Sequence, residues 1–120
     1  MTPIEALRAV CEAWTRLDND ALADLFDDEG LFDDPLNERV LRGREDVRAV
    51  TAPAMQALAE CEVTLDTALE SGEFGLGEGT FRARLADGEG RMDFSFALAV
   101  EMREGRIARL TEYFDTAPLA

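Results

Sequence analysis

Two adjacent carboxylates, Asp33 and Asp34, follow Leu31 and Phe32 and run directly into Pro35. One interpretation of this segment is a solvated turn ahead of the proline. The other is a carboxylate that points into an apolar pocket, where partial desolvation raises the pKa of a carboxyl group and makes it a better base. The segment therefore suggests proton transfer by a carboxylate.

The residue types that are missing restrict the chemistry further. The chain has no histidine, and all 12 of its basic residues are arginine. This excludes a Ser-His-Asp or Cys-His system, a lysine Schiff base and histidine-ligated zinc. Cys11 and Cys61 stand alone in the sequence and are predicted to be buried, reduced thiols. Proton transfer must then depend on Asp, Glu, the single Tyr113 or water.

Length indicates a single domain over residues 1–120, and the charge restricts its partners. A chain of 120 residues forms one hydrophobic core. The net charge of −14 disfavours nucleic-acid and anionic membrane partners. No apolar run approaches the roughly 20 residues that span a bilayer. The start "MTPIEALRAV" lacks the pattern of a signal peptide, so we expect a cytoplasmic protein.

Three helices are predicted in the first half of the chain. Residues 2–5, "TPIE", form a capping box with proline at the first helical position, and the helix runs to about residue 17. Asp18 or Asn19 caps a short second helix, which "DDEG" ends. Residues 44–60 form a third helix, which Pro53 is expected to kink or divide.

Strands are predicted after the second helix and throughout the second half. "GLFDD" and "RVL" are two short strands around a Pro-Leu-Asn turn, and four long strands follow from residue 61 with glycine-containing turns between them. The third long strand has one apolar face: Met92, Phe94, Phe96, Leu98, Val100 and Met102. Helices followed by a mostly antiparallel sheet predict an α+β fold, in which a curved sheet around a helix forms an open cone.

Two other motifs have simpler interpretations. "GLGEG", residues 75–79, lies in a strand pattern without a following helix, so it predicts a bulge or a kink in the sheet and not a phosphate loop. The acidic residues around "DDEG" do not have the spacing of a calcium loop, and no metal site is expected.

The order of these elements resembles the nuclear transport factor 2-like superfamily, which includes ketosteroid isomerases, limonene-epoxide hydrolases and SnoaL-like polyketide cyclases. The resemblance covers the whole chain and depends on "AWTRLDNDALADLFDDEGLFDDP", "LRGREDVRAV" and "EGRIARLTEYFD". It implies a cone-shaped half-barrel with N-terminal helices packed on a curved sheet, a deep pocket, no cofactor and a homodimer formed through the sheet.

The resemblance also implies candidate catalytic residues. Ketosteroid isomerases carry their base just before a proline, which matches Asp34, but Val10 and Leu98 stand where that family has its two oxyanion donors. "EYFD" resembles the last strand of the cyclases and epoxide hydrolases, and this match places the acid/base residue at Asp115 with Tyr113 beside it. Of the hydrolases' Asp-Arg-Asp relay, the chain keeps at most an arginine.

These observations predict a cofactor-free acid/base enzyme that isomerises, cyclises or hydrates a small apolar substrate through Asp34, Asp115 or both. Tyr113 and an arginine, Arg82 or Arg84, would orient the substrate. The predicted substrate-binding residues are Trp14, Phe32, Met55, Arg82, Phe94, Phe96 and Leu98. Two alternatives remain: a pocket that binds a ligand without chemistry, and a dimeric interaction module with a filled cone. The latter would pair through the face with Asp93, Ser95, Ala97 and Ala99.

Overall fold

Helix α1 (Pro3–Thr15) begins at the predicted capping box. In this computed structural model, which describes residues 1–119, the Thr2 hydroxyl accepts the Glu5 N–H at 3.2 Å and the Glu5 carboxylate accepts the Thr2 N–H at 2.8 Å. These two bonds satisfy N–H groups that the first turn of a helix leaves free. Leu7 and Val10 are buried on the side that faces the sheet.

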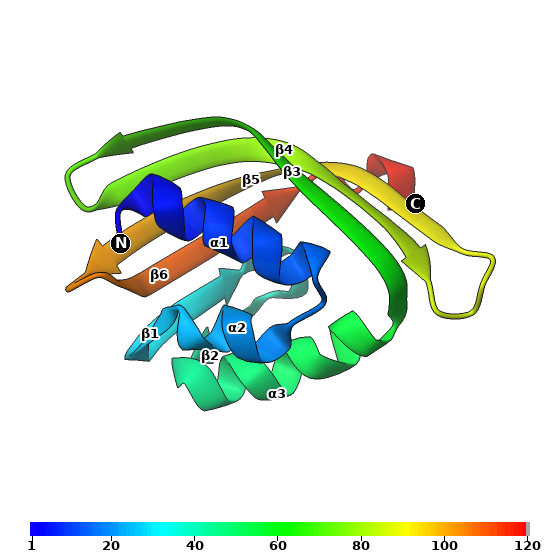
Figure 1. Cartoon of the computed structure of the whole chain (residues 1–120), viewed down its shortest axis with the longest axis horizontal. Helices are drawn as coiled ribbons and strands as arrows, with labels where there is room; N and C mark the ends of the chain where they lie inside the picture. The colour runs from blue at the N-terminus through cyan, green and yellow to red at the C-terminus, as the bar shows by residue number, and fades with distance from the viewer. Residues whose placement is uncertain (120) are drawn as a thin grey trace.

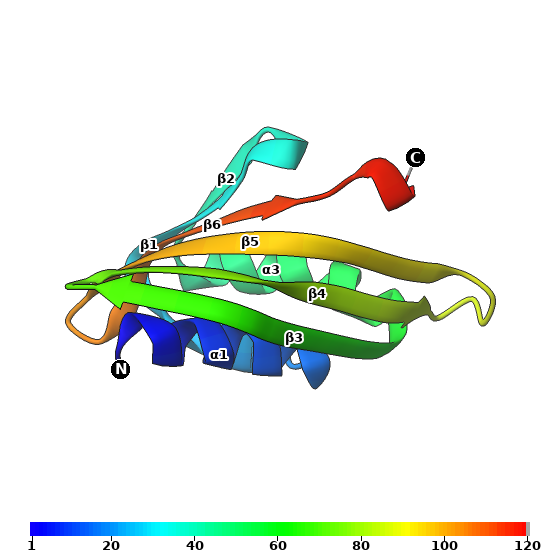
Figure 2. The ribbon, with the colours of Figure 1, turned by 90° about the horizontal axis from the view of Figure 1, so that it is seen from above.

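Six strands form a single curved sheet that does not close into a barrel. The strands are β1 (Phe26–Asp34), β2 (Arg39–Arg42), β3 (Leu58–Ser71), β4 (Phe74–Leu85), β5 (Arg91–Arg103) and β6 (Arg106–Phe114). Their order is β2-β1-β6-β5-β4-β3, with β1 and β6 parallel and every other pair antiparallel. Helices α1, α2 (Asn19–Asp24) and α3 (Gly43–Gln56) cover one face (Figures 1 and 2). The predicted α+β half-barrel is confirmed.

Two predicted boundaries were wrong. The third helix ends at Gln56, one turn after Pro53, and Leu58 already pairs with Leu85 in the sheet, so residues 58–60 are strand and not helix. The first strand was predicted to begin at Gly30, but β1 begins at Phe26 and contains "DDEG". Its register against β6 shifts between Phe26 and Leu31. Gly30 lies at this shift and approaches β6 closely: a Cβ atom there would stand 2.5 Å from the backbone oxygen of Ile107.

The glycines of "GLGEG" allow helix α1 to lie directly on β4. Gly75, Gly77 and Gly79 alternate on the buried face, and Cβ atoms at the first two would meet Pro3 and Leu7 of α1. At Gly79 a Cβ atom would collide with the backbone oxygen of Thr64, beside a register shift in β3. The irregularity of the sheet thus lies in β3, opposite Glu78 and Gly79, and not within "GLGEG" itself. The glycines of this segment set the distance between helix and sheet.

Gly79→Ala should lower the free energy of unfolding by about 1–3 kcal/mol or more, because the colliding atom belongs to the backbone and cannot rotate away. Glu78→Ala, the exposed neighbour on the same strand, should change it by less than about 0.5 kcal/mol. Urea denaturation of the two variants measures this difference. Equal effects would show that the sheet yields at Gly79.

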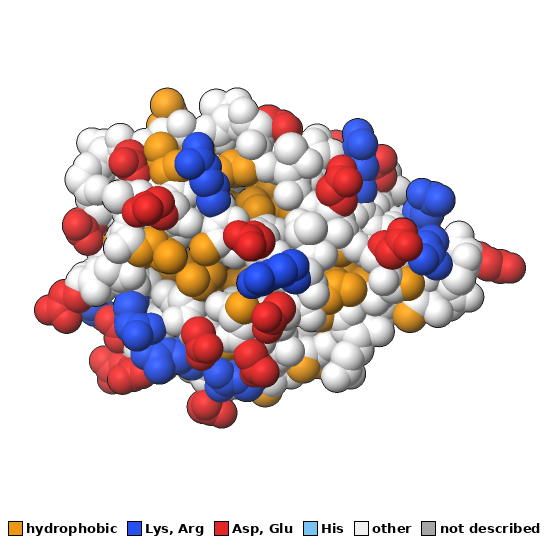
Figure 3. All heavy atoms as spheres, in the orientation of Figure 1, with side chains coloured by type: hydrophobic (Ala, Val, Ile, Leu, Met, Phe, Trp, Pro, Cys, Tyr) orange, Lys and Arg blue, Asp and Glu red, His pale blue; other side chains and the backbone are white. Residues whose placement is uncertain are grey.

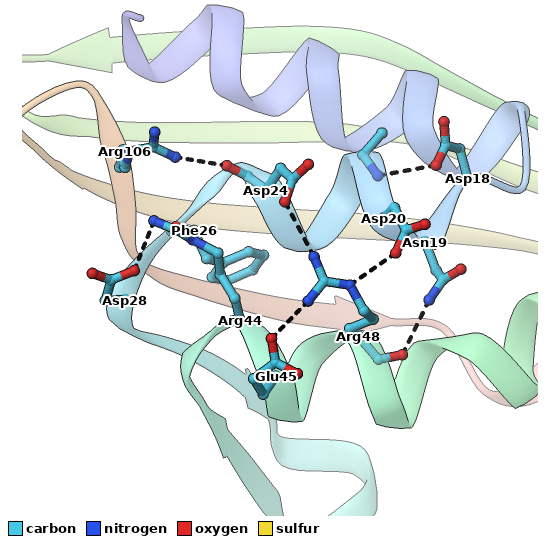
Figure 4. A network of polar contacts seen from close by, with 11 residues as sticks. Asp18, Asn19, Asp20, Asp24, Phe26, Asp28, Arg44, Glu45, Arg48 and Arg106 are labelled. Carbon is cyan, nitrogen blue, oxygen red and sulfur yellow. Dashed lines mark hydrogen bonds and ion pairs between the residues drawn. The ribbon is translucent and has the colours of Figure 1, made fainter.

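Arg48 connects helices α2 and α3 across the surface. Its guanidinium donates to Asp20 at 2.8 Å, to Asp24 at 3.2 Å and to Glu45 at 2.9 Å (Figure 4). Figure 3 shows acidic and basic side chains close together along the edge of the molecule formed by these helices. Isolated surface pairs contribute little, whereas one arginine with three carboxylates forms a network that orients α2.

Arg48→Met should therefore lower the Tm more than Arg16→Met, since Arg48 contacts three carboxylates whereas Arg16 forms the exposed i,i+4 pair with Glu12. The difference between the variants should shrink in high salt, because ions screen surface charges. Thermal denaturation at low and high ionic strength checks both statements. A difference that is independent of salt would assign the effect to packing of the arginine stem.

Candidate functional site

A cavity of about 360 Å³ lies between the helices and the covered face of the sheet. It is large enough for a small organic molecule. Its lining is mostly apolar and includes five of the predicted wall residues: Trp14, Phe32, Phe94, Phe96 and Leu98. Phe81 packs against Trp14 edge to face and stacks on Phe94. An open cavity of this size argues against the filled cone expected for a pure interaction module.

Asp34 is the buried carboxylate of this cavity. The alternation of β1 directs Phe32 and Asp34 inward, with only 3% of Asp34 exposed, and directs Asp33 outward to Arg109 at 2.7 Å. Oδ2 of Asp34 accepts the Asn37 amide at 2.7 Å and Nε of Arg39 at 3.2 Å. The solvated-turn interpretation therefore does not describe Asp34.

The turn after Asp34 supplies both of its donors. Pro35 starts a 3₁₀ turn, η1 (Pro35–Asn37), and Glu38 then adopts the left-handed conformation with φ of 53°. This reversal starts β2, which pairs with β1, so that Asn37 and Arg39 lie beside the carboxylate. A buried carboxylate needs such partners, because desolvation without hydrogen bonds is costly.

Glu112 is a second carboxyl group of the cavity, and the sequence analysis missed it. Along β6, Leu110, Glu112 and Phe114 line the cavity, and Glu112 is half-buried there. Burial raises the pKa of Glu112 to about 8; the negative charge of Asp34 acts in the same direction, and Arg39 opposes it. A carboxyl group with this pKa is mostly protonated at neutral pH.

The alternation of β6 also explains why Tyr113 and Asp115 lie elsewhere. Tyr113 is 53% exposed, and Asp115 is exposed beyond the end of the strand, where its carboxylate accepts the N–H of Ala117 at 3.0 Å. Neither residue lines the cavity, so the structure does not bring Asp34 and Asp115 together. The order Leu110-x-Glu112 in the sequence is the signal that could have identified Glu112.

Three other predicted residues also lie outside the cavity lining. Met55 is 3% exposed and belongs to the core under α3. Arg82 is exposed on the open face of the sheet, 3.7 Å from Asp93, and Arg84 contacts Glu60 at 3.0 Å. Period-two alternation accounts for both arginines, because Phe81 and Leu85 are the residues of β4 that face the cavity. Among the residues that the structure describes, the arginine that lines the cavity is Arg39.

Within residues 1–119, no three His, Cys, Asp or Glu side chains converge to hold a metal ion. Over the same part of the chain, no helix combines the length and the apolar character needed to cross a bilayer.

A sequence model of the SnoaL-like domain matches residues 7–110, which is most of the chain. The chain belongs to the SnoaL-like domain family. Comparison with curated protein sequences gave no match.

Solved structures with the same fold include three informative examples. A protein with a ketosteroid isomerase-like fold from Catenulispora acidiphila, in complex with trimethylamine, is 22% identical, with a TM-score of 0.86 over 98% of this chain and 90% of that one. TerC co-crystallised with polyporic acid is 18% identical, with a TM-score of 0.81 over 98% and 94%. An LEH-like epoxide hydrolase from M. tuberculosis is 24% identical, with a TM-score of 0.79 over 95% and 83%. The TM-scores show that these proteins share the fold of this chain.

Glu112→Gln should make this SnoaL-like domain more stable than the wild type as the pH rises. The unfolded chain releases the Glu112 proton near its ordinary pKa of 4.5, whereas the folded chain keeps it up to about 8. Stability of the wild type therefore falls across this window by up to about 1.4 kcal/mol per pH unit, and the glutamine variant lacks this loss.

Denaturant unfolding at several pH values between 4.5 and 8 measures the difference between wild type and variant. Asp115→Asn, at an exposed carboxylate outside the cavity, is the matched control and should run parallel to the wild type. A constant difference between wild type and Glu112→Gln over this window would contradict the raised pKa.

Proposed function

We propose that this SnoaL-like domain binds a small, largely apolar molecule in the cavity and transforms it by cofactor-free acid/base chemistry. The observation that carries the proposal is the buried carboxylate of Asp34 in an otherwise apolar cavity of about 360 Å³. A protein interior tolerates such a group only when hydrogen-bond donors hold it. Asn37 and Arg39 are those donors.

In this proposal Asp34 takes a proton from the substrate or from a water molecule. The reaction would be an isomerisation, a cyclisation or the hydration of an epoxide. Proton transfers suffice for each of these reactions. A positioned base contributes about 10²–10⁴-fold to the rate, and fixed hydrogen-bond donors at the reacting oxygen add to it. Arg39, whose side chain is half exposed, is well placed to reach a ligand.

The ligands of structural neighbours support the small-molecule part of the proposal. One neighbour was crystallised with trimethylamine and another with polyporic acid, and a third is an LEH-like epoxide hydrolase. By analogy the cavity of this chain takes a small organic molecule, with the apolar rings of Trp14, Phe81 and Phe94 as its walls.

A non-catalytic ligand-binding domain is the second candidate. It is favoured by the two hydrogen bonds that Asp34 already receives on Oδ2, because these donors hold the carboxylate in place without a ligand. In that case Asp34 would fix the shape of the cavity and take no proton from the ligand.

The homodimer and the cytoplasmic location stay predictions. The open face of the sheet exposes Leu69, Phe74, Leu76 and Tyr113, which is compatible with pairing of two copies.

Asp34→Asn should separate the two candidates. In an enzyme, this variant should lower kcat by about 10²–10⁴-fold, with a smaller change in ligand affinity. The assay would screen epoxides and enolisable ketones for turnover, together with calorimetric binding of every compound that associates. Asp33→Asn is the matched control, since Asp33 precedes Asp34 directly but points to Arg109 on the other side of β1.

Turnover that is unchanged in Asp34→Asn would contradict the catalytic proposal. Binding by the wild type without turnover of any compound, and unchanged binding in the variant, would favour the second candidate.

A further inference from the structure

Parallel pairing of β1 and β6 places Asp34 and Glu112 next to each other. The register pairs Phe32 with Leu110 and Asp33 with Thr111, and Asp34 and Glu112 are one step further along. Neighbouring strands are about 4.8 Å apart, and residues at the same level on the same face are side by side. Both side chains line the cavity, as do Phe32 and Leu110. The sheet therefore brings two carboxyl groups together.

One buried oxygen of this pair, Oδ1 of Asp34, has no hydrogen-bond partner among the residues that the structure describes. Asn37 and Arg39 both bind Oδ2, and the Thr51 hydroxyl is already used by the carbonyl of Val47 at 2.6 Å. A buried acceptor without a donor costs free energy, so a native structure rarely leaves one unpaired.

We propose that Asp34 and Glu112 form a carboxyl pair that holds a single proton, with the Glu112 carboxylic acid donating a hydrogen bond to Oδ1 of Asp34. A protonated carboxyl group has one O–H donor, which is what Oδ1 lacks. Two adjacent carboxylates in an apolar site do not both ionise, because each charge destabilises the other.

The groups around Glu112 agree with this distribution of charge. Asp34 from β1 favours its protonated form, and Arg39 from β2 opposes it. Helix α1 contributes Cys11, whose pKa burial raises to about 11, so that this thiol is neutral. The nearby positions of β5 and α3 that line the cavity are uncharged: Phe94, Phe96 and Leu98, and Val50, Thr51 and Ala54.

The pair specifies the charge of the ligand, an inference that rests on the proposed function of this cavity. One negative charge on the pair and one positive charge on Arg39 leave the cavity neutral overall. Such a site suits a neutral molecule with a polar oxygen, because the pair offers an acceptor and a donor at once. An anionic ligand would meet the charge of Asp34 and should bind poorly.

The test is a carbon-detected NMR titration of the Glu112 carboxyl in the wild type and three variants. In the wild type Glu112 should titrate near pH 8. Asp34→Asn should lower the pKa of Glu112 by about one unit or more, because it removes the adjacent charge. Arg39→Gln should raise it, and Asp33→Asn, on the opposite face, should leave it unchanged.

A Glu112 titration that Asp34→Asn leaves unchanged would overturn the pair, since burial alone would then explain the shift. Titration in the ordinary range of glutamate would overturn it too. Infrared spectra at neutral pH give a second measurement that does not depend on the folding of Asp34→Asn. The C=O band of a protonated carboxyl group should vanish in Glu112→Gln and persist in Asp115→Asn.

Neither measurement needs a ligand or turnover. The pair can thus fail while Asp34→Asn still abolishes a reaction, and the pair can hold in a protein that only binds.

Discussion

The burial of one carboxylate, Asp34, in an apolar cavity is the constraint on which the rest of the site depends. Removing a charge from water costs several kcal/mol unless hydrogen bonds and opposite charges replace the solvent. The chain meets this requirement with the turn after Pro35, which returns Asn37 and Arg39 to Oδ2. The left-handed backbone conformation of Glu38 reverses the chain after the turn and so brings Arg39 back to Asp34.

The same constraint determines what can lie beside Asp34. The parallel pairing of β1 with β6 places Glu112 next to it, and a second charge at that position would be costly. A neutral Glu112 avoids this repulsion and offers a donor for the second oxygen of Asp34. The apolar walls contribute as well, since they exclude the water that would otherwise screen and hydrate both groups. The glycines of β4 allow α1 to pack closely on the sheet, and this packing keeps the apolar walls in place.

Local patterns in the sequence predicted most of the helices and strands. The capping box at Thr2 and the alternation of β5 depend on neighbouring residues, and both are confirmed. Asp34 was singled out by its resemblance to the base that ketosteroid isomerases carry before a proline, and the structure places it in the cavity lining. Pro53 was less informative, because packing of α3 against β1 and α2 continues the helix past the proline.

Glu112 was missed because its orientation depends on which alternate residues of β6 face the cavity. The resemblance in "EYFD" directed attention to Asp115, but the inward positions of β6 are set by its register with β5, which shifts between Glu101 and Met102. That shift cannot be deduced from residue types. The pairing of β1 with β6 is equally non-local, since some 80 residues separate Asp34 from Glu112, and only the folded sheet shows that the two carboxyl groups meet.

Neutron diffraction from a deuterium-exchanged crystal at neutral pH tests the central claim most directly, because it locates the hydrogen isotopes on the two carboxyl groups. The account predicts one deuteron on Glu112, directed at Oδ1 of Asp34, and none on Asp34. Two bare carboxylates, or a Glu112 deuteron directed away from Asp34, would contradict it.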